Sequence, residues 1–169
     1  MKELVKQMED LYLVKKEVTT VTMCGKIKYE ESMREWAALL EIGVGWNVLL
    51  PIDIRKISGY DPSLEKSSMD KLRAIHYSKI YLSDAILVNV DDNYEFVECE
   101  NVMSEILAAL SYGKEIYFTK GLRTDIMHKI TSFVNGSTGI LGSRFRVKNY
   151  KYIDIDKFRF YQLNYSSTL

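Results

Sequence analysis

A chain of 169 residues fits one domain of ordinary size and is long enough to bury a hydrophobic core. Its composition, 47% hydrophobic and 27% charged with only 2 Pro, excludes a collagen-like or largely disordered chain. The 23 basic residues balance the 23 acidic ones, and a formal net charge of zero disfavours a protein that holds nucleic acid or a membrane surface by its overall charge.

The cysteines and histidines are far apart in the sequence. Cys24 and Cys99 form no Cys-x-x-Cys pair, and neither lies close to His76 or His128. Metal sites and disulfide frameworks usually show short recurrent spacings of such residues. We therefore expect no metal, no disulfide and no cofactor.

No targeting or membrane segment is evident. Residues 1–16 mix charged and apolar residues at helical spacing, unlike the basic start and apolar centre of a secretion signal. The longest apolar runs, such as 85–90, are far shorter than the ~20 residues of a membrane-spanning helix. We expect a cytoplasmic protein.

Strand-like and helix-like patterns alternate along the chain. Runs rich in β-branched or apolar residues predict strands at 18–24, 46–50, 85–90 and 115–119. Apolar residues spaced three and four apart predict helices at 29–42, 67–81, 101–112 and 124–134, and a loop follows at 135–139. Such alternation favours an α/β fold, with an open and mostly parallel sheet that carries helices on both faces.

The segment 143–169 is rich in tyrosine and leans basic. One interpretation is a phosphate or nucleic-acid contact with aromatic stacking from Tyr150, Tyr152 and Phe158. We favour the other, an edge strand whose lysines guard against aggregation. We expect this extension to pack on the domain formed by residues 1–142.

Ligands of open parallel sheets bind beyond the carboxyl ends of the strands, where the strand order reverses. Three segments should converge there: 24–28, 51–62 and 91–105. The first offers Gly25, Lys26 and Lys28 before a helix start, which suits an anion, although an ordinary turn would look the same.

The third segment holds six acids and no base. They are Asp91, Asp92, Glu95, Glu98, Glu100 and Glu105. A solvated acidic loop explains most of such a run. The alternative is a carboxylate cluster at a pocket, with one member as nucleophile and another as acid or base. Position favours Glu105, near the start of a helix. His76 lies on the helix before the central strand, where a lone histidine on an apolar face is more often a satisfied core residue than a catalyst.

At these positions the sequence resembles the nucleoside 2-deoxyribosyltransferase-like family. Three motifs carry the resemblance, within residues 21–118: VTMCGK at 21–26, HYSKIYLSD at 76–84 before a strand that ends in Asn89, and EILAALSYGK at 105–114. The resemblance implies a flavodoxin-like parallel sheet of about five strands. It also implies cleavage of the N-glycosidic bond of a (deoxy)nucleoside or nucleotide through a covalent glycosyl-glutamate intermediate.

The resemblance places the nucleophile at Glu105. For the proton that the departing base needs, the nearest acids are Asp84, Asp91, Asp92 and Glu98, and the choice among them stays open. The matched positions expected to hold substrate are Cys24, Gly25, Lys26, Lys28, His76 and Asn89. Family members are commonly oligomers, so we expect a homo-oligomer.

Two departures from the family pattern matter. Lys26 stands where the family has serine, and the Gly-x-Ser-Thr stretch before the glutamate is replaced by residues 95–104, which carry three glutamates. An acidic loop would repel a phosphate, so a neutral nucleoside is favoured unless basic groups offset it. A second hypothesis follows, a non-catalytic module that binds a nucleotide or another ligand on the same scaffold.

Overall fold

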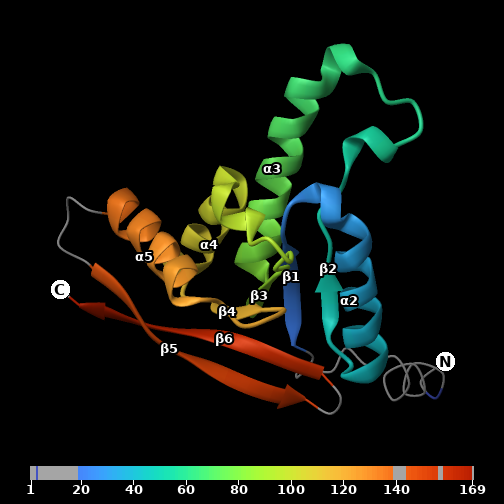
Figure 1. The fold of residues 1–169 in the computed structure, drawn as a ribbon. Coiled ribbons are helices and arrows are strands. Elements are labelled where there is room, and N and C mark those ends of the chain that lie inside the picture. The colour runs from blue at the N-terminus through green and yellow to red at the C-terminus, as the bar shows by residue number, and fades with distance from the viewer. Residues whose placement is uncertain (1–2, 4–18, 139–143, 156–157, 169) are drawn as a thin grey trace.

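The structure, a computed structural model, describes residues 3, 19–138, 144–155 and 158–168 (Figure 1). The strands are β1 (Thr20–Cys24), β2 (Asn47–Leu49), β3 (Ala85–Val88), β4 (Glu115–Phe118), β5 (Arg144–Ile155) and β6 (Phe158–Thr168). The α-helices are α2 (Glu30–Gly43), α3 (Glu65–Leu82), α4 (Glu100–Ser111) and α5 (Thr124–Thr138). Short 3-10 helices are η1 (Ile27–Tyr29), η2 (Ile54–Lys56), η3 (Pro62–Leu64) and η4 (Glu95–Glu98).

These elements form one sheet in the order β2-β1-β3-β4-β6-β5. The first four strands are parallel, which confirms the α/β class and the open parallel sheet. The parallel part has four strands rather than the expected five. The next position belongs to β6, which runs antiparallel to both β4 and β5. β5 and β6 follow each other closely in the chain, and a short connection can join only antiparallel neighbours.

Helices cover both faces of the sheet, as expected. Alternate strand residues point to opposite faces. Met23 and Leu87 pack with Met33 and Leu40 of α2 on one face. On the other face the side chains of Ile86, Val88, Ile116 and Phe118 pack with those of α3, α4 and α5. Among the described helices, Figure 1 shows only α2 on this side of the sheet.

The strand order reverses between β1 and β3. From β1 the chain moves outward through α2 to β2, then returns through α3 to β3 on the other side of β1. The hydroxyl groups of Thr22 and Ser83 lie 2.6 Å apart and tie the end of α3 to β1. This contact fixes α3 over the reversal point, where ligands of open sheets bind.

One further prediction is corrected by the structure, and two others concern residues or side chains that it does not describe. The loop expected at 135–139 is wrong for its first four residues, because α5 continues to Thr138. Ile126, Ile130 and Val134 are buried at helical spacing, and this packing outweighs the ~1 kcal/mol that Gly136 costs a helix. The extension supplies two strands, and its β5 is an edge strand. The aromatic stacking considered there as the alternative, and the helical pattern at 1–16 except for residue 3, lie outside what the structure describes.

Within the described part of the chain, no helix combines the length and apolar character needed to cross a lipid bilayer.

Candidate functional site

A cavity of about 400 Å³ lies at the carboxyl ends of β1 and β2, between the loops that follow them and helices α3 and α4. Its lining residues are Gly25–Lys28, Pro51–Arg55, eight residues of α3, and Cys99, Asn101, Val102 and Glu105. The expected convergence of three segments is therefore present. Of the third segment, 91–105, only residues within 99–105 contribute to the lining, because residues 91–98 make contacts outside the cavity.

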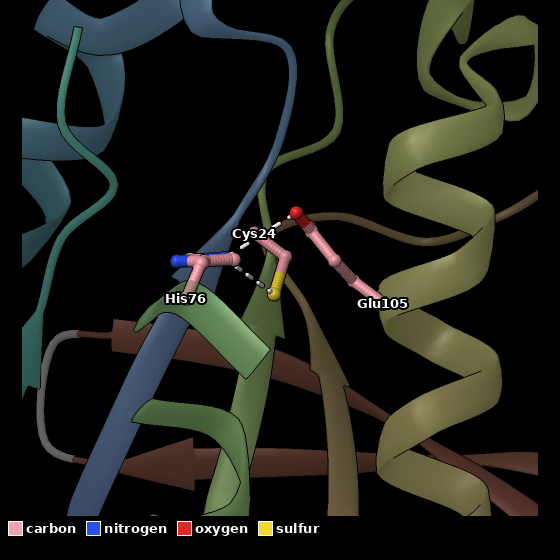
Figure 2. Close-up of side chains that lie close together, drawn as sticks. All are labelled: Cys24, His76 and Glu105. Carbon is pink, nitrogen blue, oxygen red and sulfur yellow. Dashed lines mark hydrogen bonds and ion pairs between the residues drawn. The ribbon is translucent and has the colours of Figure 1, made fainter. Parts of the chain in front are cut away.

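Glu105 stands in the second turn of α4, and its side chain is 16% exposed. Its Oε1 lies 3.4 Å from Nε2 of His76, and its buried Oε2 has no hydrogen-bond partner among the described residues. Cys24, the last residue of β1, is fully buried with its Sγ 3.8 Å from the same Nε2 (Figure 2). Three of the residues singled out in the sequence thus meet at one point.

Cys24 is unsuited to act as a free thiolate here. Burial raises the pKa of its thiol well above the usual value, and the negative charge of Glu105 raises it further. A nucleophilic cysteine instead needs a lowered pKa. Among these residues the carboxylate of Glu105 is therefore the better nucleophile.

Tyr77 and Lys79 also line the cavity, both from α3. Burial raises the pKa of Tyr77, and the charge of Glu105 adds to the shift, so the phenol remains a hydrogen-bond donor. Burial lowers the pKa of Lys79, whose Nζ donates a hydrogen bond to the carbonyl oxygen of Leu50 at 2.7 Å. Lys79 therefore anchors the end of β2 to α3.

The lysines after β1 are paired with the acidic segment. Lys28 Nζ lies 2.6 Å and Lys26 Nζ 3.4 Å from Oε2 of Glu95, which also accepts a hydrogen bond from Tyr29 at 2.8 Å. Hydrogen bonds from Lys28 and Tyr29 lower the pKa of Glu95 to about 2. The negative charge of Glu95, which the sequence analysis expected to repel a phosphate, is therefore compensated by Lys26 and Lys28.

The other acids of the segment 91–98 serve its own structure or face outward. Asp91 is buried and accepts backbone hydrogen bonds from Asn93, Glu95 and Phe96. Asp92 pairs with Lys120, and Glu98 pairs with Lys129 beside a shallow hollow that His128 also lines. None of the three lines the cavity of Glu105.

Asp84 and Asn89 flank β3 at opposite ends. The carboxylate of Asp84 accepts a hydrogen bond from the backbone N–H of Thr20, at the amino ends of β1 and β3 and thus across the sheet from Glu105. Asn89 is buried, and its side-chain oxygen accepts a hydrogen bond from Ser32 at 3.3 Å. It packs beside Gly25 instead of lining the cavity.

The sequence analysis missed most of the α3 contribution. Met69, Arg73, His76 and Lys79 recur every three or four residues, and all four line the cavity. That period places them on one face of a helix. The signal was present, but it indicates a buried face and does not show that the face borders a cavity.

Comparison with models of known protein families, with curated proteins and with solved structures finds no match for this chain. The site is therefore interpreted from its own geometry and from the motif resemblance.

Proposed function

We propose that this protein cleaves the N-glycosidic bond of a (deoxy)nucleoside or nucleotide, with Glu105 as the nucleophile. The observation that carries the proposal is a nearly buried carboxylate that borders a cavity at the reversal point of the sheet and whose Oε2 has no hydrogen-bond partner in the described part of the chain. A volume of about 400 Å³ lies within the usual range of small-molecule sites. The motif that ends in Gly113-Lys114 adds the resemblance to nucleoside deoxyribosyltransferases.

The chemistry follows the retaining pattern. A carboxylate oxygen of Glu105 forms a bond to the anomeric carbon while the bond from that carbon to the base breaks, and its electron pair leaves with the base nitrogen. Water or a second base then displaces Glu105. We assign to Tyr77 a hydrogen bond that orients the departing base, since its phenol lines the cavity and stays protonated. The leaving base takes its proton from solvent.

The ion pairs of Glu95 remove the argument against a negatively charged substrate. The preference for a neutral nucleoside depended on an acidic loop, yet Glu95 is paired with two lysines and Glu98 lies outside the cavity. Arg73 also lines the cavity, and its nearest carboxylate oxygen, on Asp70, is 3.9 Å away. Arg73 is therefore the cation best placed to meet a 5′-phosphate.

The test is detection of free base after incubation with nucleosides, deoxynucleosides and their 5′-monophosphates, with and without an acceptor base. Glu105→Gln keeps the size of the side chain and removes its charge, so turnover should fall by more than about 10³-fold. Glu100→Gln, at the exposed start of the same helix, is the matched control and should retain activity. Full activity of Glu105→Gln would exclude the proposed nucleophile.

A non-catalytic binding module is the second candidate. The observation in its favour is that η4 contains no glycine and no hydroxyl residue, although the family resemblance implies a phosphate-binding Gly-x-Ser-Thr stretch in this part of the chain. Nucleotide binding by calorimetry without base release over long incubation would favour this candidate. Base release that depends on Glu105 would exclude it.

A further inference from the structure

Three side chains of different chemistry place their donor atoms around one point. Cys24 Sγ, His76 Nε2 and a carboxylate oxygen of Glu105 all lie within 4.8 Å of one another. They come from the end of β1, the middle of α3 and the second turn of α4, as Figure 2 shows. Each is therefore held by an element of the fold that packs into the core.

The arrangement differs from a catalytic relay. In a relay the nucleophile and the orienting carboxylate take opposite ring nitrogens of the histidine. Here Sγ and Oε1 both approach Nε2, at 3.8 and 3.4 Å, and the buried Nδ1 has no partner among the described residues. Donor atoms that converge in this way are arranged as ligands of a common atom.

The spacing fits a tetrahedral metal. Bonds from Zn²⁺ of about 2.3 Å to sulfur and about 2.0–2.2 Å to nitrogen and oxygen put neighbouring ligand atoms about 3.4–3.6 Å apart. Two of the separations, 3.8 and 3.4 Å, already match within about 0.3 Å of that range. The third, from Sγ of Cys24 to the carboxylate of Glu105, is at most 4.8 Å, and zinc binding would bring it within that range.

The burial of Cys24, His76 and Glu105 also favours a bound cation, because a cation would pair with their buried polar atoms. His76 is 8% exposed and Cys24 is fully buried, while Oε2 of Glu105 is buried with no hydrogen-bond partner among the residues that the structure describes. Leaving buried polar atoms unpaired is costly. A divalent cation would bind the carboxylate and a thiolate, and the resulting site would carry no net charge.

We propose that Cys24, His76 and Glu105 form a binding site for Zn²⁺. A thiolate, an imidazole and a carboxylate suit this borderline-soft ion and disfavour Mg²⁺ and Ca²⁺, which prefer oxygen ligands. On binding, the S–H bond of Cys24 breaks, its proton goes to solvent, and an S–Zn bond forms. Three protein ligands leave the fourth position to face the cavity that His76 and Glu105 line.

The metal site does not depend on the proposed function, although both use Glu105. A carboxylate bound to zinc cannot attack a sugar, so Zn²⁺ would inhibit glycosyl transfer if both hold. The sequence analysis expected no metal, because residues 24, 76 and 105 are separated by more than any recurrent ligand spacing.

The test is titration of the purified full chain with Co²⁺ and with Zn²⁺ against a chromophoric chelator. We expect one equivalent to bind, with the absorption of tetrahedral cobalt and a thiolate-to-cobalt charge-transfer band. Cys24→Ser should abolish that band. His76→Ala and Glu105→Gln should weaken binding by more than about 100-fold, since loss of even an outer partner of a ligand costs 10–100-fold.

The chain supplies matched controls. Cys99→Ser removes the other cysteine, which lines the same cavity, and His128→Ala removes the other histidine. Both variants should bind as wild type does. The absence of a thiolate–cobalt band in the folded wild-type protein would overturn the proposal, and so would a band lost in Cys99→Ser but kept in Cys24→Ser. Circular dichroism confirms folding, and base release is measured separately, so failure of one proposal leaves the other standing.

Discussion

Gly25 shows how closely the backbone packs beside the candidate site. A Cβ at this position would lie 3.1 Å from Cβ of Asn89 and 3.1 Å from Sδ of Met33. These distances are shorter than ordinary carbon contacts of about 3.5–4.0 Å. The glycine therefore lets the chain turn from β1 toward the cavity while Asn89 and α2 pack against it.

Gly25→Ala should destabilise the protein by about 1–3 kcal/mol, because the added methyl group overpacks this contact. Gly136→Ala is the control, since Gly136 lies in α5 and the added methyl group would meet no atom within 4 Å among the described residues, apart from its chain neighbours and the backbone of its own helix. It should stabilise by about 0.5–1 kcal/mol through helix propensity. Urea unfolding measures both, and shifts of the same sign would contradict the account.

At the residue scale the sequence predicted part of the site. Glu105, His76, Gly25 and the two lysines were singled out, and all of them line the cavity. The contact between His76 and Glu105 could not be predicted, because it joins α3 to α4 and no local pattern encodes how two helices pack. Asp84 was placed among the candidate acids by its nearness in sequence, but β3 separates it from the carboxyl edge.

At the scale of elements, the segment 91–98 is ordered by a single carboxylate. Asp91 accepts hydrogen bonds from three backbone N–H groups, and Phe96, which is fully buried, contacts the core. The run of acids looked solvated in the sequence. The conformation of this segment depends on the buried Asp91, which nothing in the sequence distinguishes from the neighbouring acids.

Asp91→Ala should destabilise the protein by about 1–3 kcal/mol, since it leaves backbone donors without their acceptor. Its neighbour provides the control: Asp92 is exposed and pairs only with Lys120 at 3.1 Å among the described residues, so Asp92→Ala should change stability by less than about 0.5 kcal/mol. Hydrogen exchange at 93–96 should accelerate only in Asp91→Ala. Equal effects of the two substitutions would refute the assigned role.

Element types were predictable and element ends less so. Strong periodicity identified four helices and the parallel strands, whereas α3 begins at Glu65, two residues before the prediction. The hairpin was the main surprise. A tyrosine-rich basic stretch predicts a strand, but its pairing with β4 is a long-range contact that no local pattern specifies.

At the scale of the molecule, the segment before α3 and the first turns of that helix extend away from the sheet (Figure 1). Their apolar side chains are exposed: Ile57 by 48% and Leu64 by 58%. A second copy of the chain would bury such a surface. The homo-oligomer implied by the family resemblance stays a prediction, and this surface is where we expect the second copy to bind.

Light scattering should therefore give a mass above the 19.6 kDa of one chain, and Leu64→Glu should lower it because a charge resists burial. Ile42→Glu, on α2 and 88% exposed, is the control and should keep the wild-type mass. A single-chain mass for the wild type at all concentrations would contradict this prediction.

The place of β6 in the sheet also governs the order of events during synthesis. β6 begins 40 residues after β4 ends (118 to 158) and is the strand that pairs with its outer edge. At 5–20 residues per second, the ribosome needs about two to eight seconds to make that stretch. Throughout this interval the nascent chain offers β4 as an open edge, the kind of template on which chains pair wrongly. Translation speed over residues 119–158 therefore sets how long this edge of the newborn sheet stays unpaired.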